Sequence, residues 1–128
     1  MTAAIYITLE RKIEGVTASD VDGKLLARFS DNLDLLCESN NLRTVSSFVS
    51  ANPIDLPEAI AALSSLPFFK EKWFDSKLGL QSIEFLASHV SDHSSEFPDG
   101  LKSDLDAARR VLETAARQDV RFHFTVDV

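Results

Sequence analysis

The chain has 128 residues and a formal net charge of −7 at pH 7, and 45% of its residues are hydrophobic. This length and composition predict a single globular domain, residues 1–128, and argue against a disordered chain. The acidic balance argues against nucleic-acid and membrane partners, because phosphate and anionic lipid both repel negative charge.

The composition also predicts a compartment. Cys37 is the single cysteine, so an internal disulfide is excluded. No apolar run approaches the length of about 20 residues that a membrane helix needs. The first residues, "MTAAIYITLERK", have no basic segment ahead of the short apolar stretch, unlike a signal peptide. We therefore expect a cytoplasmic protein.

Residues 4–10, "AIYITLE", alternate with a period of two. Ile5, Ile7 and Leu9 point to one side, and Tyr6, Thr8 and Glu10 point to the other. Because alternation and β-branched residues are typical of a sheet with one buried face, this segment predicts a half-buried strand.

After a turn-rich loop, residues 24–39 predict an amphipathic helix. Its apolar stripe consists of Leu25, Phe29, Leu33 and Leu36, with Leu26 and Cys37 at the edge. Asp20 or Asp22 is suited to cap its start, and Asn40-Asn41 to end it in the left-handed conformation. A tight hairpin turn at Asp22-Gly23 is the alternative.

Residues 44–56 leave two possibilities open. Val45, Phe48 and Val49 suit either a short helical turn or a brief strand, and Pro53 then breaks regular structure. A short helix is expected from Pro57, because proline is favoured in the first turn.

Residues 68–75, "FFKEKWFD", concentrate four aromatic side chains: Phe68, Phe69, Trp73 and Phe74. Burying each large aromatic contributes about 2 to 3 kcal/mol, so we expect most of them in the core. The charged residues between them require one edge to touch water. The alternative for Trp73 and Phe74 is an exposed edge that binds a partner, where tryptophan is favoured as an anchor.

Two amphipathic helices are predicted over residues 77–92 and 101–118. The buried stripe of the first consists of Leu80, Ile83, Leu86, Ala87 and Val90. That of the second consists of Leu101, Leu105, Ala108, Leu112 and Ala115, with Val111 beside them. The outer face of the second carries Lys102, Asp106, Arg109, Arg110, Glu113 and Arg117.

The chain ends in a second predicted strand, residues 120–128. The side chains expected to face inward are Val120, Phe122, Phe124, Val126 and Val128, and those expected to face outward are Arg121, His123, Thr125 and Asp127. An isolated strand cannot pair its backbone groups, so the two terminal strands should share a sheet. The expected fold is α+β: a small, mainly antiparallel sheet including the N- and C-terminal strands, with three to four helices packed on one face.

The last 60 or so residues carry several short apolar motifs. They are Trp73-Phe74, Gly79-Leu80, Asp104-Leu105, Val111 to Ala115, and Arg121 to Asp127. In these motifs the chain resembles an uncharacterised family of small bacterial proteins with no established activity. The resemblance implies a shared α+β fold and a bacterial setting, and it implies no catalytic residues.

Few residues suggest chemistry. His89 and His93 are spaced to place both imidazoles on one side of a helix, as a zinc site needs, but the sequence offers no second cluster of ligands. Cys37, at the edge of an apolar stripe, suits a buried structural thiol. His123 and Tyr6 would share the outer sheet face, where acid–base chemistry is conceivable. We expect no metal and no cofactor.

These patterns favour a non-catalytic cytoplasmic module that binds another protein, in the manner of immunity, inhibitor or accessory proteins, or a second copy of itself. The uneven charge along the chain would steer such a partner. The alternative is a small-molecule binder or minor enzyme that uses the outer sheet face around Tyr6 and His123. The candidate contact residues are Tyr6, Trp73, Phe74, Arg121 and His123.

Overall fold

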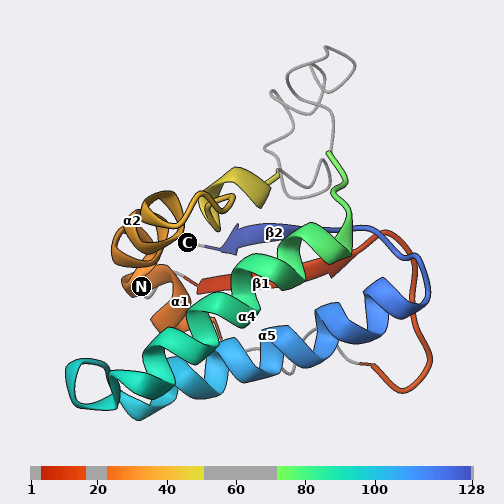
Figure 1. Ribbon diagram of the computed structural model, residues 1–128. Coiled ribbons are helices and arrows are strands. Elements are labelled where there is room, and N and C mark those ends of the chain that lie inside the picture. Colours follow the sequence, from red (N-terminus) through yellow and green to blue (C-terminus); the bar gives the residue numbers. More distant parts are fainter. Residues whose placement is uncertain (1–3, 17–22, 51–71, 128) are drawn as a thin grey trace.

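The two ends of the chain lie side by side in one antiparallel sheet (Figure 1). In this computed structural model, which describes residues 4–16, 23–50 and 72–127, strand β1 (Ala4–Leu9) pairs with strand β2 (Phe122–Asp127). Ile7 lies opposite Phe124. The prediction that the terminal strands share a sheet is confirmed.

Short segments also pair with the second edge of β2. Val49 forms a parallel bridge with Phe124, and Phe74 forms an antiparallel bridge with Phe122. The Phe74 and Phe122 backbones exchange two hydrogen bonds of 2.8 and 3.0 Å. A 3₁₀ helix, η2 (Ser46–Phe48), precedes Val49, so a helical turn and a brief strand-like contact both occur where the sequence left the choice open.

The part of the chain that the structure describes has four α-helices packed against this sheet. They are α1 (Lys24–Arg28), α2 (Ser30–Ser39), α4 (Ser76–Asp92) and α5 (Asp99–Arg117). A single 3₁₀ turn, η5 (Ser94–Glu96), lies in the connection from α4 to α5, and these two helices run side by side below the sheet (Figure 1). The predicted α+β fold is confirmed.

The helix predicted over residues 24–39 is broken in two at Phe29, where φ is −101° and ψ is 11°. The reason is tertiary, because α1 packs against β1 and α5 whereas α2 packs against α4. The break shifts the buried stripe, so that the predicted edge residues Leu26 and Cys37 are fully buried together with Leu33.

The two ends of this helical region differ in how well they were predicted. The residue preceding α1 is Gly23, with a φ of 75°, and its oxygen accepts hydrogen bonds from the amides of Ile5 and Ala27. Asp20 and Asp22, the predicted caps, lie outside the described residues, as does the first half of the alternative hairpin turn. Asn41, with a φ of 58°, adopts the predicted left-handed conformation after α2.

The hydrophobic core lies between the sheet and the helices. Its largest fully buried side chains are Phe48, Phe122, Phe124, Ile7, Leu26, Leu33, Ile83, Leu86, Leu101, Leu105 and Leu112. The predicted stripe of α5 is buried throughout, and that of α4 is buried except for Leu80, which is partly buried. No helix of the described residues is long and apolar enough to cross a membrane. The helix expected from Pro57 lies outside these residues.

Gly79 marks the closest approach of helix to sheet. A Cβ atom at this position of α4 would lie 2.3 Å from Cζ of Phe122, far inside van der Waals contact. The absence of a side chain therefore lets α4 pass directly against the β2 aromatic ring.

Candidate functional site

The structure brings together Trp73 and His123, two of the predicted contact residues. Trp73 lies on the extended segment that leads into α4, and its ring centroid is 4.8 Å from that of His123 on β2. Trp73 is partly buried, whereas His123 is fully buried. The prediction that Trp73 packs mainly as core, with one edge in water, agrees with this exposure.

His123 also belongs to a row of polar side chains that crosses both strands, with buried members on β2 and the partly buried Thr8 on β1. Its Nδ1 lies 3.1 Å from the oxygen of Phe124 and 3.3 Å from Oγ1 of Thr125. Oγ1 of Thr125 is in turn 2.7 Å from Oγ1 of Thr8. Because backbone and hydroxyl partners satisfy buried polar atoms, this row is compatible with a packed interior.

The prediction that one face of β2 is open to solvent is therefore wrong in part. Alternation correctly placed His123 and Thr125 on the face opposite Phe122 and Phe124, yet both are buried. Trp73, 50 positions earlier in the chain, packs over His123. Val126, predicted to face inward, is instead 44% exposed near the end of the strand.

Arg121 and Tyr6 occupy other parts of the sheet. Arg121 is exposed and donates two hydrogen bonds, of 2.9 and 2.5 Å, to the carboxylate of Glu10. The hydrogen bond from Arg121 and its positive charge hold the pKa of Glu10 below its ordinary value, and Glu10 raises the pKa of Arg121. Tyr6 is partly buried and lies opposite Thr125 across the two strands.

Phe74 points away from this face. Its ring packs edge-on against Phe48, with centroids 5.5 Å apart, and joins the hydrophobic core. The guanidinium of Arg43 lies over both rings, 4.5 Å from the centroid of Phe48 and 4.9 Å from that of Phe74. Sequence reasoning missed Arg43, because no local pattern links it to Phe74. Phe68 and Phe69 lie outside the described residues.

His89 and His93 stack on each other rather than diverging into solvent. Their ring centroids are 4.2 Å apart, and Nδ1 of His93 lies 2.9 Å from the oxygen of His89. Phe85 and Phe97 both contact the ring of His89, with centroids 6.0 and 6.3 Å away, so His89 is the centre of an aromatic cluster. The described residues contain no group of three or more His, Cys, Asp or Glu side chains placed to hold a metal ion.

Cys37 is fully buried, as predicted for a structural thiol. Burial, and then the negative charges of Asp34 and Glu38, raise its pKa to about 11. Because the thiolate is the reactive form, this environment keeps Cys37 unreactive at neutral pH.

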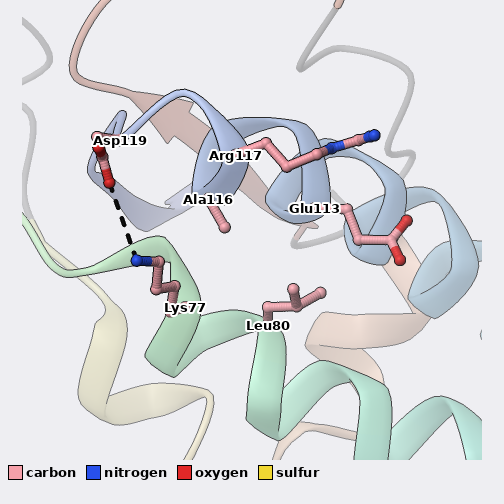
Figure 2. A pocket seen from close by; sticks show the side chains of 6 residues that line it. All are labelled: Lys77, Leu80, Glu113, Ala116, Arg117 and Asp119. Atoms are coloured by element: carbon pink, nitrogen blue, oxygen red, sulfur yellow. Dashed lines mark ion pairs between the residues drawn. The ribbon is translucent and has the colours of Figure 1, made fainter.

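An open pocket of about 570 Å³, which the sequence did not indicate, lies between the start of α4 and the end of α5. Its lining residues are Lys77, Leu80, Glu113, Ala116, Arg117 and Asp119. Figure 2 shows Lys77 and Leu80 on α4, with Glu113, Ala116 and Arg117 opposite them on α5. Lys77 and Asp119 approach to 4.0 Å across the opening.

This pocket continues along the two helices. A neighbouring pocket of about 370 Å³ shares Glu113 with the first and extends past Ala87, Ser88 and Ser91 of α4. A third, of about 270 Å³, shares Lys102 and Asp106 with the second. We call these three connected pockets the α4–α5 groove. Charged side chains of both helices line it, together with small and apolar residues.

Comparisons with protein-family models, with curated proteins and with solved structures found no match. The resemblance of the last 60 or so residues to a family of small bacterial proteins therefore stays a prediction.

Proposed function

We propose that this chain is a non-catalytic cytoplasmic protein that binds another protein, in the manner of immunity, inhibitor or accessory proteins, and that Trp73 is an anchor of the contact. The observation that carries the proposal is the placement of Trp73, a large aromatic that is partly exposed while its ring rests on a fully buried side chain.

The surroundings of Trp73 hold it in place. Its neighbour Phe74 is tied to β2 by two backbone hydrogen bonds, and the Trp73 ring packs on His123. A side chain that is already ordered loses little conformational entropy on binding, so more of its contact energy contributes to affinity. Tryptophan is also among the residues most enriched at the energetic centres of protein interfaces.

The candidate chemical groups favour binding over catalysis. His123 is fully buried, and the pKa of Cys37 is raised to about 11, so neither offers solvent an activated base or nucleophile. The same burial gives no support to the alternative, a small molecule bound around Tyr6 and His123, which stays a prediction.

A comparative capture experiment tests the proposal. The wild-type chain and Trp73→Ala serve as baits in a lysate of the native cell, and bound proteins are quantified by mass spectrometry. Leu78→Ala is the matched control, because Leu78 is a 44% exposed apolar residue on α4. We expect at least one protein that wild type and Leu78→Ala enrich and that Trp73→Ala loses.

Circular dichroism of each bait establishes that the helices are retained, and Trp73→Phe keeps an aromatic ring over His123 if Trp73→Ala does not fold. An identical set of captured proteins for folded wild-type and Trp73 variants would contradict the proposal, and so would the absence of any enriched protein.

A further inference from the structure

We propose that two copies of this chain associate through the α4–α5 groove, with α5 of each copy running antiparallel along α5 of the other. The inference goes beyond the proposed function and develops the alternative raised by the sequence, that the chain binds a second copy of itself. It rests on the proposed function only for the premise that the chain acts by binding. The α4–α5 groove is a separate surface, because Trp73 is not among its lining residues.

A row of alternating charge on α5 is the first observation. Lys102, Asp106, Arg109 and Glu113 follow one another at spacings of four, three and four residues, which places them along one side of the helix. Consecutive members are 3.0, 4.0 and 3.7 Å apart, so they already form a connected network within one chain. The row carries two positive and two negative charges and has no net charge.

All four charges of this row can be paired with opposite charges when a second copy lies antiparallel. When a second α5 lies antiparallel and is centred between Asp106 and Arg109, Lys102 of each copy faces Glu113 of the other. In the same register Asp106 of each copy faces Arg109 of the other. Two-fold symmetry makes each pair occur twice, as an isologous interface requires. A parallel arrangement in register would instead place every charge against its own kind.

The groove also solves a problem of overall charge. Two chains of net charge −7 repel each other, so a contact between copies is favoured where the surface is close to neutral. Across the three pockets the charges nearly balance, with four cationic residues, Lys77, Lys102, Arg109 and Arg117, and five anionic ones, Glu84, Asp99, Asp106, Glu113 and Asp119.

The shape of the groove suits a second helix. Ala87, Ser88 and Ser91 line its α4 side and Ala116 lines its α5 side. Because small side chains let helix axes approach closely, the partner's longer charged side chains have room to lie in the groove. Leu80, which is partly buried, adds an apolar contact near its end.

Two charge-altered variants provide the test. Lys102→Glu with Arg109→Glu makes the row wholly acidic, and Asp106→Lys with Glu113→Lys makes it wholly basic. By light scattering, we expect wild type to have twice the 14.2 kDa mass of one chain and each variant alone to be monomeric. An equimolar mixture of the two variants should recover the dimer, and native mass spectrometry should find one copy of each. Salt should weaken the wild-type dimer.

The matched control is Lys12→Glu with Arg110→Glu. It makes the same change in net charge as the acidic variant, at two exposed residues that do not line the groove, and it should remain dimeric. Recovery of the dimer in the mixture would also establish that both groove variants fold.

Three outcomes would overturn the inference: a monomeric wild type at its highest soluble concentration, a dimer unchanged in the acidic variant, or a mixture that does not associate. A monomeric wild type whose captured partner is lost only in the acidic variant would assign the groove to a different protein and would likewise overturn it. Trp73→Ala should remain dimeric, so failure here is distinguishable from failure of the proposed function.

Discussion

At the scale of single residues, the pair formed by Glu10 and Arg121 links β1 to the start of β2. Arg121 depresses the pKa of Glu10, so the stabilisation from this pair is present above the ordinary pKa near 4.5 and is lost as pH falls through the lower, folded-state pKa. Both groups are at the surface, where such pairs contribute little to stability.

We predict that Arg121→Gln raises the pKa of Glu10 towards its ordinary value, because both the hydrogen bonds and the positive charge are lost. A carboxyl-detected NMR titration measures this directly. Lys12→Gln is the control, since Lys12 is exposed and is not among the groups that shift Glu10. An unchanged pKa in Arg121→Gln would show that the pair does not persist in solution.

His123 shows what the alternating pattern of a strand can predict and what it cannot. The alternation of β2 was sufficient to place His123 opposite Phe122 and Phe124, because successive strand residues must point to opposite faces. It could not indicate that the opposite face is covered, because the covering Trp73 comes from a segment 50 residues away. Whether the polar face of a strand is buried depends on the segments that pack over it.

At the scale of elements, the contact between α4 and β2 depends on Gly79. An alanine there would place its Cβ 2.3 Å from the fully buried Phe122 ring, which has little room to move. Overpacking of this kind costs about 1 to 3 kcal/mol. Alanine gains about 1 kcal/mol over glycine in helix propensity, so the steric cost should win.

We predict that Gly79→Ala lowers the free energy of unfolding, as measured by urea denaturation. Gly100→Ala is the matched control in α5, because its Cβ would approach only Leu25, at 2.6 Å from the terminal Cδ1, and the end of this partly buried side chain can shift at lower cost than the buried Phe122 ring. The control should stay within about 1 kcal/mol of wild type. Equal stability of the two variants would refute the close approach of α4 to β2.

The break between α1 and α2 belongs to this scale too. Every residue from 24 to 39 suits one continuous helix, and Phe29 is neither glycine nor proline. The helix divides because its first part packs against β1 and α5 and its second against α4. Periodicity reports which residues prefer burial, and it does not report that two burial surfaces point in different directions.

At the scale of the whole molecule, the sheet joins the two ends of the chain, so its formation requires nearly all of the sequence to be in place. Ile7 on β1 is 1% exposed and lies opposite Phe124 on β2. We predict that Ile7→Ala lowers the free energy of unfolding by about 2 to 5 kcal/mol, as large-to-small changes in a packed core do. The control Val126→Ala, at a 44% exposed position of the same sheet, should cost far less.

The same experiment reports on cooperativity. Trp73 is the only tryptophan, and it packs on β2, so its fluorescence follows the sheet, while far-ultraviolet circular dichroism follows the helices. The two signals should change together during unfolding, because the terminal strands and the helices share one core. Separate transitions would show that the helices persist without the sheet.

Local physics was enough to predict much of this protein. Alternation defined both terminal strands, helical periodicity defined the buried stripes of α4 and α5, and the need of every strand for a hydrogen-bonded neighbour joined β1 to β2. These inferences succeeded because strand alternation and an apolar helix stripe are set by residues close in sequence, and because two strands that each need a partner can pair with each other.

Other features arose only from packing between distant segments. They include the covering of His123 by Trp73, the division of the helix at Phe29, and the α4–α5 groove between two exposed helix faces. Each is a relation between surfaces that lie far apart along the chain. The charges and small residues of the groove are visible in the sequence, but their alignment into one surface depends on how α4 and α5 lie against each other, which no single helix pattern encodes.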